Sequence, residues 1–215
     1  MGWEMALATY SDLKASVQDW SHRNDVASRI DDFILIAEQE MYNNRVEPLV
    51  VREQEFRATA DTTIISRFIA LPDGFNRMRR LLIDDKTTGA NQYELKFYTP
   101  EVLPISSCSG MPSAFTVTSQ LEFDRIPDAV YNIDMQYFGT PAALTTAAPT
   151  NDILTNYPTI YLAGCLWALF SWANDGQRAT AAYDDFIGAI RGANKADILG
   201  RYGPAPTMRN ERAVV

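Results

Sequence analysis

Apolar residues recur at every third or fourth position between residues 28 and 46, which is the spacing of one face of a helix. Asp31 and Asp32 stand in the first turn, where carboxylates stabilise the positive end of the helix dipole. Leu35 and Ile36 widen the apolar stripe, so we expect more than one neighbouring element to cover this helix. The residues of the stripe itself are Ile30, Phe33, Ile34, Ala37 and Met41.

The same period predicts two pairs of helices. Residues 10–47 are expected to form a helical hairpin, with Ser11 as the cap of its first helix. A short polar link joins the two helices, which favours antiparallel packing. Residues 152–200 are expected to form a second hairpin, with Pro158 in a first helical turn and Gly200 ending the last helix.

Between residues 53 and 141 the hydrophobic period falls to two, which predicts a β-rich insertion. Tyr131–Tyr137 alternates cleanly and predicts an antiparallel strand with one face toward solvent. Residues 118–120 are expected to join the two strands of a hairpin, and Thr99–Glu101 resembles the start of a short helix. Further strands are expected at residues 62–71, 78–83 and 93–98.

These patterns predict an α+β fold within a single domain covering residues 1–215. Its antiparallel core of about four helices would carry the β-rich insertion and an extended C-terminal tail. Residues 201–215 hold two prolines, three arginines and one glutamate without an amphipathic period. This composition favours an extended segment that orders on a partner; simple fraying of the chain end is the alternative. If the tail docks, the expected contact residues are Tyr202, Pro204, Met208, Arg209 and Arg212.

Composition limits the possible partners. Hydrophobic residues make up 47% and charged residues 21%, as in ordinary globular proteins. The formal net charge of −8 argues against wrapping nucleic acid, although it suits a surface past which DNA slides. Cys108 and Cys165 form no CxxC motif, so a reducing cytoplasm is expected. No apolar run approaches the length of a membrane-spanning helix, so no membrane contact is expected.

A catalytic constellation is not evident. His22 is the single histidine and lies in a polar link, and the phosphate-binding glycine motifs are missing. Glu38 and Glu40 resemble a hydrolytic carboxylate pair, but a spacing of two turns them to different faces of a helix. We therefore predict no catalytic residue, no cofactor and no bound metal. Adjacent aspartates could contribute to a magnesium site, although caps and solvated turns explain them better, at positions 31–32, 84–85 and 184–185.

Short motifs occur in a defined order from Tyr10 to about Leu199. In that order the chain resembles the head-to-tail adaptor (head-completion) proteins of short-tailed bacteriophages. Gly74 departs from the LPxDF-like form expected in the family, so the geometry of that loop is not carried over. The motifs are Tyr10-x-x-Leu13-Lys14, Ile30-Asp31-Asp32-Phe33-Ile34-x-x-Ala37-Glu38, Leu71–Phe75, Tyr98–Glu101, Gly110–Pro112 before Phe115–Val117, Tyr137-Phe138 and Tyr157-Pro158.

The resemblance implies a structural virion protein that assembles in the host cytoplasm. Such adaptors form a homo-oligomeric ring, usually of twelve subunits, between the portal protein and the tail or nozzle protein. The ring continues the DNA channel, helps retain the genome until ejection, and lets double-stranded DNA pass without sequence-specific binding. The C-terminal tail would reach the portal. Some relatives are associated with cell-wall hydrolysis, so a tail-associated peptidoglycan-degrading enzyme using a carboxylate pair is the alternative.

Overall fold

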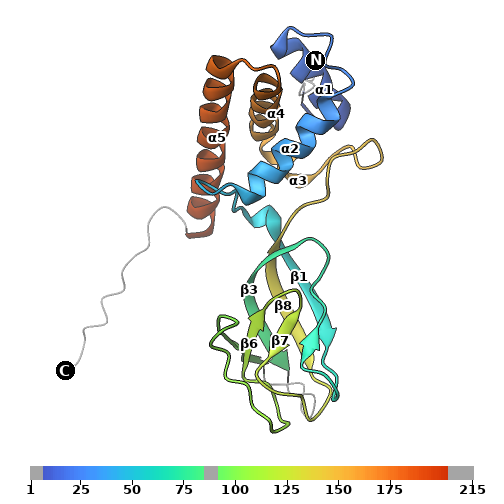
Figure 1. Cartoon of the computed structure of the whole chain (residues 1–215), viewed down its shortest axis with the longest axis vertical. Helices are drawn as coiled ribbons and strands as arrows, with labels where there is room; N and C mark the ends of the chain where they lie inside the picture. Colours follow the sequence, from blue (N-terminus) through green and yellow to red (C-terminus); the bar gives the residue numbers. More distant parts are fainter. Residues whose placement is uncertain (1–6, 85–91, 203–215) are drawn as a thin grey trace, which may run out of the picture. The chain divides into compact units, whose positions relative to one another are not determined.

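The computed structural model of the protein describes residues 7–84 and 92–202. Five α-helices and two four-stranded sheets give the α+β fold that the sequence predicts (Figure 1). The chain divides into two compact units, each with its own core. We call them the helical unit, made of the described residues up to Glu53 and from Pro141, and the β unit, residues 54–140.

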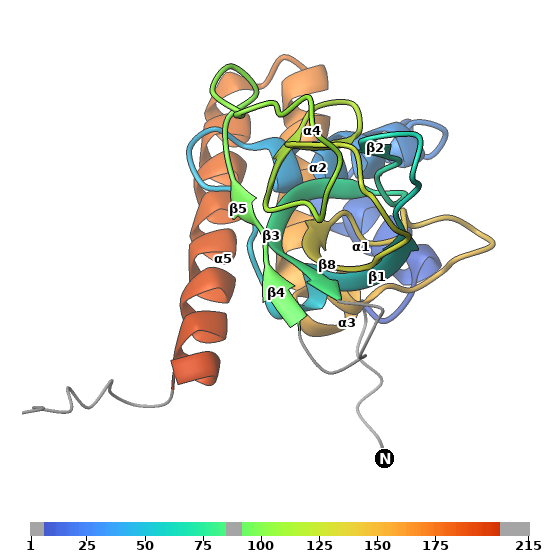
Figure 2. The ribbon, with the colours of Figure 1, turned by 90° about the horizontal axis from the view of Figure 1, so that it is seen from below.

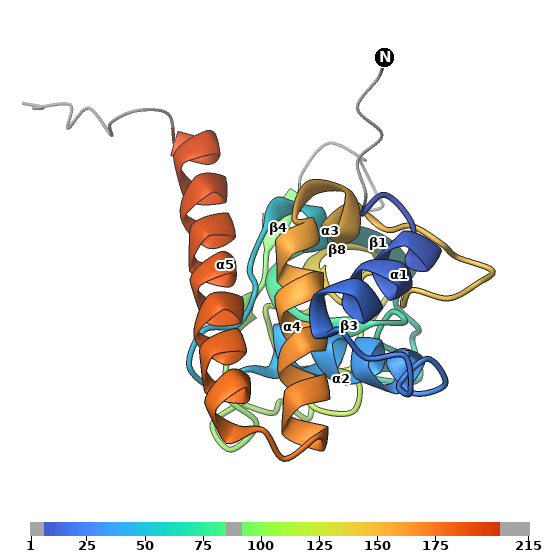
Figure 3. The same cartoon turned by 90° about the horizontal axis from the view of Figure 1, so that it is seen from above.

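The helical unit is built around its fourth helix. Helix α4 packs against α5 on one side and against α1 and α2 on the other (Figure 3). Because it is covered from several directions, its sequence is apolar almost all round. The short α1–α2 link does not make these two helices each other's main partner; α1 packs more extensively on α4. The helices are α1 (Tyr10–Ser21), α2 (Ile30–Asn43), α3 (Asp152–Asn156), α4 (Pro158–Trp172) and α5 (Gly176–Tyr202).

The apolar face predicted for the central helix is correct. All five of its residues are buried in α2, whereas Leu35 and Ile36 stay 52% and 41% exposed. The prediction that neighbouring elements also cover Leu35 and Ile36 is therefore not met within the described residues. At the centre of the unit, Gly164 of α4 lets α2 and α5 approach closely.

Two predicted helix ends are wrong. The cap of α1 is Thr9 rather than Ser11: the Asp12 amide donates to Thr9 Oγ1, and the Thr9 amide donates to Asp12 Oδ2. Helix α5 continues through Gly200 to Tyr202, so residues 201 and 202 are helical rather than part of a tail. Near this end, the Asp197 side chain bonds the Arg52 amide of another segment and Arg201 of the same helix.

The β unit contains two sheets. The first is antiparallel throughout, with the order β1-β8-β3-β4, and the second has the order β2-β7-β6-β5 with a parallel β5–β6 pair. The predicted alternating strand is confirmed as β8, and the predicted hairpin around residues 118–120 is confirmed as β6–β7. The strands are β1 (Glu55–Asp61), β2 (Phe68–Ile69), β3 (Phe75–Asp84), β4 (Gln92–Glu94), β5 (Lys96–Phe97), β6 (Ala114–Val117), β7 (Leu121–Phe123) and β8 (Asn132–Gly139).

Three predictions in the β unit need correction. Of the strand expected at 62–71, only the two residues of β2 are formed. The preceding strand, β1, ends just before this segment, at Asp61. The expected strand at 93–98 breaks at Leu95 into β4 and β5, which lie at the edges of different sheets (Figure 2). Residues 99–102 form a single turn instead of a helix: the Val102 amide bonds the Thr99 carbonyl, and Pro104 follows.

The second sheet is fastened to its flanking loop by Asp124, which is 2% exposed. Its carboxylate accepts hydrogen bonds from the backbone amide and hydroxyl of Ser113, from the Ala114 amide and from Arg125. Burial acts to raise the pKa of Asp124, but these donors outweigh burial and lower that pKa. The ionised carboxylate is therefore part of the folded β unit.

Candidate interaction surfaces

The carboxylates singled out for catalysis have separate structural partners. Glu38 is 7% exposed, and its Oε1 accepts hydrogen bonds from the Leu144 amide and the Tyr161 hydroxyl, each at 3.0 Å. Glu40 instead accepts a hydrogen bond from Asn44 at 2.8 Å. The structure thus confirms that the two side chains serve different faces of α2. It does not bring them together as a pair.

Glu38 holds the connector between the β unit and α3 against α4. The connector includes Leu144, whose amide donates to Glu38, and Asn151, whose side chain donates to the Tyr161 hydroxyl at 2.8 Å. Burial raises the pKa of both Glu38 and Tyr161. The phenol therefore stays protonated and can donate to the carboxylate, so the cluster is suited to fixing a loop.

The C-terminal end of α5 is bonded to the segment that follows α2. Asp197 is 4% exposed; it accepts a hydrogen bond from the Arg52 amide at 3.2 Å and one from Arg201 Nε at 2.5 Å. The last turns of α5 are thereby joined to the segment around Arg52. Tyr202 is the last described residue, and the other predicted partner contacts lie outside the described residues, namely Pro204, Met208, Arg209 and Arg212.

An apolar hollow of about 180 Å³ opens between α4 and α5. The small side chains Ala182 and Ala189 of α5 leave this space, and Leu162 and Leu166 of α4 form its apolar wall. Trp20, at the end of α1, borders the hollow and is 64% exposed. An exposed tryptophan beside an apolar hollow is typical of a surface that another protein covers.

The β unit exposes a second apolar surface at the turn after β1, which we call the isoleucine tip, residues 63–66. A bridge between Thr63 and Ser66 closes this turn, and Ile64 and Ile65 stand 58% and 84% exposed. A neighbouring hollow of about 460 Å³ is bordered by further exposed apolar side chains. These are Phe68, Ile105 and Ile126.

Sequence reasoning missed the isoleucine tip because it assigned two β-branched residues to a strand interior. Tight turns ordinarily carry glycine, asparagine, aspartate or proline, so the pattern gave no turn signal. The usable signal was the polar residues on either side, Thr62-Thr63 and Ser66-Arg67. Two large apolar residues that stay largely exposed at a turn contribute little to the core of the unit, which marks the tip as an interaction surface.

The described residues also bear on metal binding and on membrane insertion. Across residues 7–84 and 92–202, no group of three or more histidine, cysteine, aspartate or glutamate side chains is placed to hold a metal ion. His22 is exposed and ends α1 in the left-handed conformation. None of the described helices combines the length and apolar character needed to cross a membrane.

Comparison with known proteins identifies the family. Residues 8–209 match the family model described as SU10 adaptor protein, which covers the helical unit and the β unit alike. Comparison with curated proteins gives no match. The match confirms the resemblance to phage adaptors found in the sequence motifs. The chain therefore belongs to the SU10 adaptor protein family, a family of structural adaptors in phage virions.

Proposed function

We propose that this protein forms a ring of twelve subunits that connects the portal to the tail, continues the DNA channel and helps retain the packaged genome. The observation that carries the proposal is the family match over residues 8–209. The net charge of −8 supports a channel wall to which DNA does not adhere. Assembly would take place in the host cytoplasm, and the ring would meet a tail or nozzle protein on its other side.

A ring with rotational symmetry needs two different patches on each subunit, because each copy meets its neighbour head to tail. The described residues offer apolar surface on both units: the hollow between α4 and α5, and the isoleucine tip. These surfaces are suited to contacts with neighbouring copies and with other virion proteins. The peptidoglycan-degrading alternative has no comparable support, since Glu38 and Glu40 serve separate structural partners.

We further propose that the C-terminal tail attaches the ring to the portal. Arg209 and Arg212 would bind carboxylates, and Tyr202, Pro204 and Met208 would supply apolar contact. Each tail alone would bind weakly. Twelve tails on one ring would bind far more tightly, because each bound tail raises the effective concentration of the others.

Light scattering after gel filtration tests the adaptor proposal. Mixed with the portal of the same phage, the full chain should give a complex near the mass of the portal plus a full ring. Removal of residues 203–215 should abolish this complex while leaving the circular dichroism unchanged. The cut follows Tyr202 because Arg201 is bonded to Asp197 within the fold.

A charge control separates specific contact from loss of positive charge. Arg209→Glu with Arg212→Glu should weaken attachment at least tenfold, whereas Lys195→Glu on the exposed side of α5 should not. Attachment that survives removal of residues 203–215 would contradict the role of the tail. A chain that stays monomeric at every portal ratio would contradict the adaptor function itself.

A further inference from the structure

Strand β3 has an edge that is only partly covered. It pairs with β8 along most of its length, whereas β4 pairs only with its last three residues, Leu82–Asp84. Among the described residues, no strand lies on the β4 side of Asn76–Arg80. Backbone groups on such an edge can accept a further strand.

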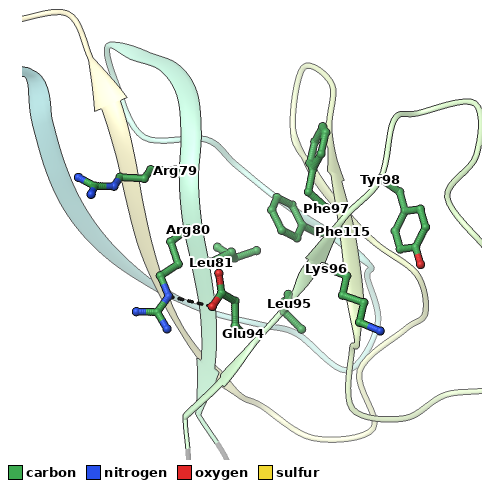
Figure 4. A pocket seen from close by; sticks show the side chains of 9 residues that line it. All are labelled: Arg79, Arg80, Leu81, Glu94, Leu95, Lys96, Phe97, Tyr98 and Phe115. Atoms are coloured by element: carbon green, nitrogen blue, oxygen red, sulfur yellow. Dashed lines mark ion pairs between the residues drawn. The ribbon is translucent and has the colours of Figure 1, made fainter. Parts of the chain in front are cut away.

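A groove runs along this uncovered edge. It consists of two adjoining hollows of about 540 and 430 Å³, which share Arg79, Phe97 and Phe115 in their linings. Figure 4 shows β3 on one side of the first hollow and the β5 segment on the other, with Phe115 directed between them. The groove is therefore bounded by one edge of each sheet.

The β5 side of the groove also offers free backbone. The amides of Lys96 and Tyr98 donate to the Ser113 and Phe115 carbonyls. Since successive amides of a strand point in opposite directions, the Phe97 amide points away from β6. Each sheet therefore has a partly unpaired edge, and the two edges lie on opposite sides of one groove. The sheets diverge from Leu95, where the chain passes from β4 in one sheet to β5 in the other.

The lining combines apolar and basic side chains. Phe97 is 58% exposed and contacts Phe115 edge to face, with ring centroids 5.6 Å apart. Arg80 pairs with the exposed Glu94 at 3.1 Å, and Lys96 forms no ion pair within the described residues. The two hollows are lined by four basic residues and one acidic residue, namely Arg77, Arg79, Arg80, Lys96 and Glu94. Arg79 is paired with Glu55 and Arg80 with Glu94, so the remaining charge of Arg77 and Lys96 makes this groove locally positive on a chain of net charge −8. That balance favours an acidic occupant.

Two features could instead protect the edge from pairing. The β3–β8 register shifts between Phe75 and Arg77 and again between Met78 and Arg80, and bulges with charged residues commonly block unwanted strand addition. A protected edge, however, does not require an exposed phenylalanine beside it. Arg79 also points away from the hollow toward its partner Glu55, so it does not obstruct the groove (Figure 4).

We propose that this groove binds an extended segment of a partner protein in which acidic and apolar side chains alternate, added as a strand beside β3. Its backbone would pair with Asn76–Arg80, its apolar side chains would cover Phe97 and Phe115, and its carboxylates would meet Arg80 and Lys96. The inference does not depend on the ring or on portal attachment. The basic tail of this chain does not fit the groove, because its arginines would meet Arg80 and Lys96.

The first test uses three synthetic eight-residue peptides on the full chain. One alternates valine and glutamate, the second alternates valine and lysine, and the third repeats the first with alternate amides methylated. Only the unmethylated acidic peptide should bind well, with at least tenfold weaker binding of the other two. The backbone amides of residues 76–80 and 97 should shift in NMR spectra and exchange more slowly.

Protein variants then locate the site. Lys96→Glu and Phe97→Ser should each weaken binding of the acidic peptide at least fivefold, and Lys195→Glu, which changes the same charge on α5, should leave it unchanged. Circular dichroism of each variant verifies the fold. Equal binding of acidic and basic peptides, shifts mapped to other residues, preferential binding of a peptide of residues 203–215, or no binding would each overturn the proposal. These outcomes leave the light-scattering test of the adaptor function unaffected.

Discussion

Gly164 lies where three helices of the helical unit meet. A Cβ atom at this position would lie 3.0 Å from Ala37 Cβ on α2 and 3.0 Å from the Phe186 ring on α5. By contrast, a Cβ atom at Gly188 or Gly192 of α5 would lie in open space. The lack of a Cβ atom is thus required for packing at Gly164. At Gly188 and Gly192 it only lowers helix stability, because glycine loses more backbone freedom on folding.

We expect Gly164→Val to lower the unfolding free energy of the helical unit by about 1–3 kcal/mol, because the added atoms must displace Ala37 or Phe186. The matched control Gly192→Ala should raise it by roughly 0.5–1 kcal/mol, because alanine loses less backbone freedom in a helix. Urea unfolding followed by circular dichroism measures both. Equal midpoints for the two variants would show that the contact at Gly164 is not tight.

We expect the β unit to lose stability in acid because of the contacts that Asp124 makes. Its folded-state pKa is lowered, so its stabilisation is complete above the unfolded-state pKa of about 3.9 and is lost as the pH falls toward the lower folded-state value. Asp124→Asn should lower the unfolding free energy at pH 7 by about 1–3 kcal/mol and flatten its dependence between pH 5 and 3. The exposed Asp73→Asn is the control and should change neither quantity. An unchanged slope in Asp124→Asn would exclude this carboxylate as the source.

At the scale of elements, hydrophobic periodicity predicted the helices and strands that bury one face. It did not predict element boundaries that are set by contacts between distant parts of the chain. The alternation of residues 131–137 located β8, because one of its faces packs into the core. The break at Leu95 has no local signal, since two different sheets capture the flanking residues. The candidate surfaces were harder still to predict. Exposed residues such as Trp20 and Ile65 are of the same apolar types as core residues, and only their surroundings in the fold distinguish them.

The isoleucine tip provides a prediction at this scale. Ile64→Ser with Ile65→Ser should change the unfolding free energy of the β unit by less than about 0.5 kcal/mol, because both side chains are already exposed. The same change should reduce assembly, read as the mass of the complex formed with the portal. Ile133→Ser, at a fully buried position of β8, is the contrast and should destabilise the unit strongly. Normal assembly of the tip variant would remove the tip from the set of interfaces.

At the scale of the whole molecule, the chain enters and leaves the β unit through neighbouring strands. Glu55 at the start of β1 pairs with Phe138 near the end of β8, so the two crossing points lie side by side. Each unit also buries its own set of apolar residues. The β unit is therefore an insertion that the helical unit can carry without giving up core contacts.

We expect residues 54–140 to fold as an isolated fragment, and the helical unit to fold when a short glycine–serine linker replaces them. Neighbouring strands lie roughly 5 Å apart, so a linker of about four residues spans the crossing points without strain. Dispersed NMR spectra of the fragment, and a cooperative thermal transition of the linked helical unit, would confirm two independent cores. If the tail after α5 carries attachment, the linked helical unit should still bind the portal, but more weakly than the full chain because it lacks the isoleucine tip. The isolated fragment should retain binding of the acidic peptide. A fragment without dispersed signals would show that its sheets depend on the helical unit for their folding.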